Sequence, residues 1–228
     1  FAMLALVVSG LAELPSRPLA GSIKAGVGSA LAFLGGGFSG LLVTAPLLPL
    51  VLLFSSECRT PRASGALLLG LCLAVTLAAA WPIALQLTHP ELLTLWLRAE
   101  WLRLTGPALA LRDIGDLLEL AGWFLWPLWP LALWALWRGR RKLATLPVML
   151  PLLSLMLVVL WLVTSGDSSQ APMILLIPAS ALLAASGVST LRRGAASAFD
   201  WFALMSLAVF GVLVWLAWTA QAVGWPPG

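Results

Sequence analysis

The sequence predicts an all-α, polytopic helical membrane protein, and its composition and the length of its apolar runs both lead there. Hydrophobic residues make up 61% of the 228 residues and charged residues only 10%, with a mean hydropathy of +1.01. An ordinary soluble domain carries about 25% charged residues, so this chain has too little polar surface to cover itself in water. Crossing the hydrocarbon takes roughly 20 apolar residues in a helix. Runs such as 63–87 and 199–220 are long enough.

The expected helices can be placed in order along the chain. Residues 1–12 form an apolar run too short to span a membrane, and because the chain starts inside this run we expect the N-terminal part of a longer protein to precede it. The glycines Gly35, Gly36 and Gly37 should break the next apolar stretch in two. About seven apolar helices are expected: 20–34, 40–54, 63–87, 117–137, 143–163, 172–188 (at the short limit) and 199–220.

An amphipathic helix is expected between the third and fourth of these. From Pro90 onward, leucines and tryptophans recur at helical spacing while charged residues fall between them. Pro90 suits a first helical turn, and Gly106–Pro107 ends the pattern. The segment 88–116 is therefore expected to lie on the outer membrane face, within a single transmembrane helical domain that covers residues 1–228.

The basic residues predict how the chain is oriented. Most of the lysines and arginines fall in three short loops, 55–62, 138–142 and 189–198, and the run RGRRK alone has four of them. Alternation of the helices puts these loops on one side, which the positive-inside rule makes cytoplasmic. This accounts for the net charge of +4, and no basic surface for nucleic acid is expected. Most of the 13 tryptophans are expected to be interface anchors.

Few side chains of the apolar helices offer chemistry. Nearly every acid and base lies at a helix end or in a loop, which disfavours an ion-coupled transporter. One histidine and two cysteines at unrelated positions predict no zinc site, and no catalytic set is expected within this chain. Asp113, Asp116 and Glu119 most simply stabilise a helix N-terminus. The alternative is that they bind a divalent cation.

Three arginines, Arg98, Arg103 and Arg112, stand out because they lie on the predicted outer side. Positive charge there opposes the orientation signal, so it needs a reason of its own. The simpler interpretation is contact with lipid headgroups. The functional interpretation is that they hold the phosphate of a lipid-linked substrate, because the guanidinium fork matches phosphate geometry.

Four passages carry a family resemblance: GSALAFLGGGFSGLLVTAPLLPLVLL, AAAWPIALQLTHPELLTLWLRAEWLRLTG, WFLWPLWPLALWALWRGRR and MILLIPASALLAASGVSTLRRG. In this order they resemble a small-residue helix with a glycine turn, a Trp-Pro helix end with an outer amphipathic helix, an aromatic helix ending in a basic loop, and a late helix after a polar loop. Together they are similar to the C-terminal part of bacterial GT-C membrane glycosyltransferases that use polyprenyl-phosphate sugars, the group of protein mannosyltransferases and aminoarabinose transferases.

The resemblance implies transfer of a sugar from a polyprenyl-phosphate donor to an acceptor on the outer face of the bacterial inner (plasma) membrane. Glu100, Arg98 and Arg103 would line the outer cavity, with Arg112 as a further candidate for the lipid phosphate. The carboxylate that activates the acceptor would lie upstream of this chain. The implied partners are membrane lipids, and the implied small molecule is the polyprenyl-phosphate-linked sugar.

The chain also departs from the family pattern. Gly36 stands in the glycine turn where the family often has Lys, and the late outer loop TSGDSSQAP (164–172) lacks the Arg and Tyr often found there. These departures favour an alternative, a non-catalytic membrane subunit or scaffold descended from such an enzyme, with other membrane proteins as partners. A transporter is the second alternative.

Overall fold

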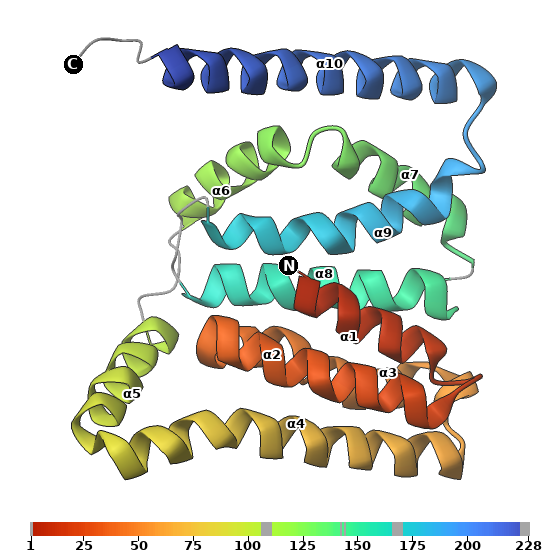
Figure 1. The fold of residues 1–228 in the computed structure, drawn as a ribbon. Helices are drawn as coiled ribbons and strands as arrows, with labels where there is room; N and C mark the ends of the chain where they lie inside the picture. Colours follow the sequence, from red (N-terminus) through yellow and green to blue (C-terminus); the bar gives the residue numbers. More distant parts are fainter. Residues whose placement is uncertain (1, 106–110, 142, 144, 166–170, 224–228) are drawn as a thin grey trace. The chain divides into compact units, whose positions relative to one another are not determined.

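The computed structural model contains helices and no strands in the part of the chain that it describes, which confirms the all-α prediction (Figure 1). It describes residues 2–105, 111–141, 143, 145–165 and 171–223, leaving out the side chains of residues 111–114, 117, 165 and 171–172. Contacts divide the chain into two compact units, Phe1–Gly187 and Val188–Gly228. Each unit is described by itself.

Four stretches of the described residues are long and apolar enough to cross a membrane: Pro18–Phe54, Pro61–Thr88, Leu146–Thr164 and Arg193–Val223. The chain is therefore an integral membrane protein of the helical type. Two shorter apolar helices, Ala2–Glu13 and Met173–Val188, fall below that length. This agrees with the expectation that residues 1–12 are too short to span, and that 172–188 lies at the limit.

The first long stretch reverses direction at Gly37, so it forms two arms rather than one helix. α2 (Pro18–Thr44) contains Gly37 at φ 63° and ψ −148°, outside the helical region. A Cβ atom placed on Gly40 would overlap the carbonyl of Ala32, eight residues earlier, which requires the two arms to pack against each other. α3 (Leu47–Phe54) continues the second arm. The predicted break within the three glycines is thus confirmed.

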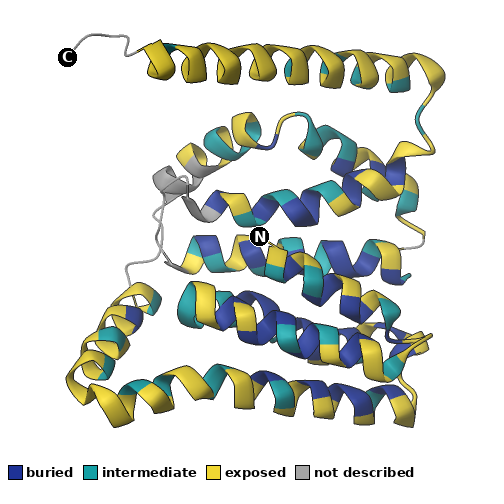
Figure 2. Ribbon diagram, viewed as in Figure 1, coloured by how far each residue is buried: buried dark blue, intermediate teal, exposed yellow. Residues whose placement is uncertain are grey.

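α2 packs closely between α1 (Ala2–Glu13) and α4 (Pro61–Thr88). A Cβ atom on Gly10 would press on the backbone of Gly21, and one on Gly26 would overlap the carbonyl of Gly70. Small residues let the helix backbones approach this closely, as expected for membrane helices. Figure 2 shows the buried residues concentrated in α1 to α3, α8 (Leu146–Ser165) and α9 (Leu176–Val188).

The predicted amphipathic helix is present, but the predicted helix 117–137 is not continuous. α5 (Pro90–Leu104) begins at the expected proline. α6 (Leu111–Phe124) and α7 (Leu128–Gly139) form two helices, and their apolar parts are bent by 96°. The prediction of one continuous helix was therefore wrong, although the bent pair taken together is still long and apolar enough for one span. Pro127 explains the break, because it lacks a backbone N–H and its ring clashes with the preceding turn of a straight helix.

The basic loops of the first unit share one end. In Figure 1 α7 ends and α8 begins at the same end of the unit at which α3 ends and α4 begins, whereas α4 ends and α5 begins at the other. The common side predicted for loops 55–62 and 138–142 agrees with this arrangement. A 3₁₀ turn, η2 (Ala171–Leu175), precedes α9.

The second unit consists mainly of α10 (Arg193–Val223), which confirms the predicted helix 199–220. None of its residues is buried, and large apolar side chains are exposed along its length. A helix that is apolar all round is the form expected of a membrane-embedded segment.

Candidate functional site

The glycine turn of α2 is closed by an acidic side chain from α5. Glu100 is only 2% exposed and is the one buried residue of α5. Its Oε2 accepts a hydrogen bond from the backbone N–H of Phe38 at 3.0 Å. Because Phe38 begins the second arm, this N–H lacks a carbonyl partner one turn earlier, and the positive end of the helix dipole favours a carboxylate there. Glu100 therefore caps a helix whose first residue is 62 positions away in the sequence.

Gly37 is required by this arrangement for two reasons. Its φ and ψ fall in a region that essentially only glycine occupies. A Cβ atom on it would also overlap the carboxylate of Glu100. The backbone of the turn and the Glu100 carboxylate therefore each exclude a residue larger than glycine at position 37.

An aromatic cluster holds α5 against the same turn. The ring of Trp96 lies 5.6 Å from that of Phe38, 5.9 Å from that of Phe33 and 5.1 Å from that of Trp81, between ring centres. Phe33 and Phe38 also contact each other edge-on at 5.5 Å. Such pairs stabilise by about 0.5–1.5 kcal/mol beyond the area that they bury. Trp96 is therefore a packing residue that fixes α5 on α2 and α4.

Of the four predicted site residues, the structure pairs Glu100 with Arg103 and places Arg98 nearby on the same helix. Arg103 donates from Nη1 to Oε1 of Glu100 at 2.7 Å, so this arginine is engaged with the acid. Arg98 lies nearby, lining a shallow hollow with Phe38, Trp101 and two leucines. Arg112 is at the start of α6, and its side chain lies outside the described residues.

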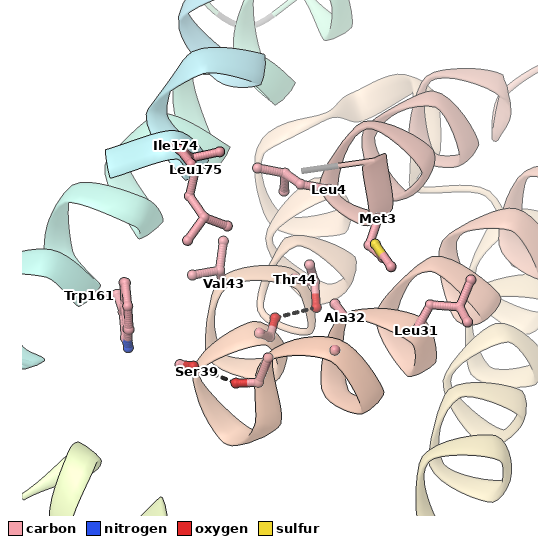
Figure 3. Close-up of a pocket in the computed structure, with 13 residues that line it drawn as sticks. Met3, Leu4, Leu31, Ala32, Ser39, Val43, Thr44, Trp161, Ile174 and Leu175 are labelled. Atoms are coloured by element: carbon pink, nitrogen blue, oxygen red, sulfur yellow. Dashed lines mark hydrogen bonds between the residues drawn. The ribbon is translucent and has the colours of Figure 1, made fainter. Parts of the chain in front are cut away.

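A second feature beside the turn is a cavity of about 350 Å³ (Figure 3). It lies between α1, both arms of α2, α8 and η2, and none of its lining residues is titratable. The two hydroxyls are already bonded within α2, Ser39 to the carbonyl of Gly36 and Thr44 to that of Gly40. Its size falls in the range of ligand pockets, and its chemistry suits a hydrocarbon chain. Its lining residues are Met3, Leu4, Leu31, Ala32, Gly35, Gly36, Ser39, Gly40, Val43, Thr44, Trp161, Ile174 and Leu175.

Gly36 differs from its neighbours because it faces open space. A Cβ atom on it would have no heavy atom within 4 Å, in contrast to Gly37 and Gly40. The backbone there needs no glycine for packing, and a longer side chain at this position would start from the cavity wall. Position 36 is thus a place in the turn where a side chain could be added and change the cavity.

No metal centre is assembled by the described residues: no three Asp, Glu, His or Cys side chains among them lie close enough to hold an ion. Asp116 and Glu119 on α6 are exposed, and the side chain of Asp113 lies outside the described part. The divalent cation considered for this cluster stays an untested alternative.

An ion pair also links the first two helices. Lys24 of α2 pairs with Glu13 of α1 at 2.5 Å, which holds these helices together.

Sequence reasoning missed the partners of Glu100, of Gly37 and of Trp96. It placed Glu100 in the lining of an outer cavity, and it did not distinguish Trp96 from the tryptophans that were expected to be interface anchors. One signal was available, because Glu100 lies between the apolar residues Ala99 and Trp101, but nothing in the sequence pairs position 100 with position 38. Most of the loop TSGDSSQAP lies outside the described residues.

Comparison with protein-family models, curated proteins and solved structures finds no match for this chain. The class that the fold defines is an integral, helical membrane protein, in which a glycine turn capped by a remote carboxylate borders an apolar cavity.

Proposed function

We propose that this chain is the membrane domain of a GT-C-type protein that binds a polyprenyl-phosphate-linked sugar and serves its transfer to an acceptor on the outer face of the bacterial inner membrane. In this proposal loops 55–62, 138–142 and 189–198 are cytoplasmic, because they hold most of the positive charge. The glycine turn, α5 and the cavity then lie toward the outer side.

The cavity is the observation that carries the proposal. Its wall is apolar and about 350 Å³ in volume, which suits several isoprene units of a lipid tail. Arg98, on α5 beside the same turn, forms no ion pair with the described residues, so its guanidinium is available for a phosphate. Arg103 is less available because it already pairs with Glu100.

A matched pair of glycine variants tests lipid binding. Gly36→Leu should fill part of the cavity without a clash, and Gly65→Leu on α4 is the control because a Cβ there also meets nothing within 4 Å. We expect Gly36→Leu to weaken polyprenyl-phosphate binding about tenfold, or about 1.4 kcal/mol, with Gly65→Leu unchanged. Equal affinities for both variants, each folded like the wild type, would contradict the role of the cavity.

The transfer reaction itself is tested on the full-length protein. With a polyprenyl-phosphate sugar and an acceptor in reconstituted membranes, we expect release of the polyprenyl phosphate to depend on the acceptor. A folded full-length protein that binds the lipid but releases nothing would refute the transferase and leave the lipid-binding part of the proposal standing.

A second candidate, a non-catalytic membrane subunit, is favoured by a specific observation. No acid or base lines the cavity, and the buried carboxylate nearest to it, that of Glu100, is used to cap a helix. General acid–base chemistry would therefore have to come from elsewhere. The subunit hypothesis expects co-purification with a membrane protein in mild detergent, and a chain that runs alone would count against it.

A further inference from the structure

A stripe of large apolar side chains runs along α7, and neither the glycine turn nor the cavity uses it. Trp129, Leu133 and Trp137 are spaced four residues apart and so share one helix face. Trp126, just before the helix, joins them through a ring contact with Trp129 at 6.3 Å. These four residues, the tryptophan stripe, are 40% to 66% exposed.

The stripe ends in a cluster of positive charge. Arg138, Arg140 and Arg141 are all exposed, and none of them forms an ion pair with any residue that the structure describes. The guanidinium of Arg140 lies 4.7 Å from the ring centre of Trp137, so the cation stacks on the last member of the stripe. The three arginines also sit at the C-terminal end of α7, where the helix dipole favours cations.

The tryptophan stripe and the arginine cluster need different chemical groups as partners, and one kind of molecule carries both groups. The stripe needs hydrocarbon against it, and the arginines need anions at the level where the helix ends. A second copy of this chain would bring hydrocarbon, but it carries the same basic cluster and a net charge of +4, which disfavours pairing of two copies at this end. A phospholipid brings an acyl chain and a phosphate in the right order.

We propose that the end of α7 is a binding site for an anionic phospholipid. The acyl chain lies along the tryptophan stripe, and the phosphate is held by the guanidinium groups of Arg138, Arg140 and Arg141. Arginine suits this role because its fork donates two parallel hydrogen bonds to phosphate oxygens. Arg140, stacked on Trp137, is oriented before the lipid arrives, so less conformational freedom is lost on binding. The site is independent of the proposed transfer reaction, since no residue of the cavity or the glycine turn takes part.

The test compares lipid retention in the whole protein. Wild type is reconstituted in nanodiscs of phosphatidylcholine with one quarter phosphatidylglycerol, re-extracted into mild detergent, and the lipids that stay bound are counted by native mass spectrometry. We expect phosphatidylglycerol to be retained in preference to phosphatidylcholine. The triple variant R138Q/R140Q/R141Q should retain on the order of tenfold less phosphatidylglycerol, because each basic group near a membrane surface contributes substantially to anionic-lipid binding.

The matched control is R17Q/R62Q/R192Q, which removes the same charge from other basic positions of the chain. It should retain phosphatidylglycerol like the wild type. Equal loss in both triple variants would overturn the proposal, because the effect would then belong to net charge alone. Retention by R138Q/R140Q/R141Q at the wild-type level would overturn it as well.

A second variant covers the case in which the glutamine variant fails to insert. Trp137→Ala leaves the basic residues in place, so the orientation signal is kept, and it removes the ring on which Arg140 stacks. We expect it to retain about two- to fivefold less phosphatidylglycerol. If Trp137→Ala instead splits a dimer of this chain without changing lipid retention, protein covers the stripe and the proposal is wrong.

Discussion

The chain bends sharply at Gly37 inside α2 and again between α6 and α7, and the two bends satisfy their backbone groups in different ways. At Gly37 the N–H of Phe38 is bonded by Glu100 from another helix. At the α6–α7 bend the hydrogen bonds are local. The N–H of Leu125 donates to the carbonyl of Ala121 at 2.9 Å, and the N–H of Leu128 donates to the carbonyl of Leu125 at 2.6 Å. Pro127 has no N–H to satisfy.

The difference matters because an apolar environment leaves no water to complete a broken helix. A bend made by proline removes the donor that would otherwise be unsatisfied, so it needs nothing from the rest of the fold. A bend made by glycine leaves a backbone N–H without its partner in the helix, so a side chain from another segment must supply the acceptor. We therefore expect the Gly37 turn to depend on tertiary structure and the α6–α7 bend to be largely independent of it.

The largest expected effect follows from Gly37→Val. Valine would have to adopt a backbone conformation that is essentially limited to glycine, and its side chain would overlap the Glu100 carboxylate. We expect a loss of at least about 3 kcal/mol of unfolding free energy, seen as a lower thermal unfolding midpoint in detergent. Gly36→Ala is the control and should change the midpoint little, since nothing lies within 4 Å of its Cβ. Equal midpoints for the two variants would show that the turn is not constrained as described.

Removing the acceptor should come next. Glu100→Ala leaves the N–H of Phe38 without its partner and frees Arg103, at a cost of about 2–4 kcal/mol. Hydrogen exchange at the amide of Phe38 should accelerate strongly relative to other amides of the second arm. Glu100→Gln keeps one acceptor oxygen and should lose less. Unchanged exchange at Phe38 in Glu100→Ala would rule out the cap.

Arg103→Gln should have a smaller effect than either change above. The Arg103 side chain is 69% exposed, so solvent screens its pairing with Glu100. We expect a loss of less than about 1 kcal/mol in unfolding free energy, further reduced at high salt. A loss as large as that of Glu100→Ala would mean that the arginine, rather than the Phe38 N–H, is the main partner of the carboxylate.

The smallest effect on stability is expected at the other bend. Pro127→Ala restores a backbone N–H and removes the clash with the preceding turn, so α6 and α7 can straighten while stability changes by less than about 1 kcal/mol. Spin labels at Leu118 and Trp137, in a variant without Cys58 and Cys72, should move farther apart in pulsed-dipolar measurements. An unchanged distance would show that packing, rather than Pro127, holds the 96° bend.

Much of the fold follows from the sequence because its causes are local. The apolar runs were long enough to set the helices that can span a membrane, Pro90 marked the start of α5, and the three glycines marked a break. The error over 117–137 was also local. Pro127 and Pro130 were present in the run. Hydropathy does not report the direction of a helix, however, so a bent apolar helix pair and a continuous apolar helix give the same hydropathy pattern.

The sequence by itself determined that this protein lies in a membrane, where its helices run and where its basic loops fall. These features follow from hydropathy, proline, glycine and charge, which act locally along the chain. Only the tertiary structure decided what Glu100 does. The same acidic side chain on an outer helix could have faced a substrate, and it instead lies buried against a backbone N–H from a segment 62 residues earlier. Which donor meets a given acceptor depends on how the helices pack, because the hydrogen bond needs both groups within about 3 Å of each other, and no pattern along the chain encodes that distance.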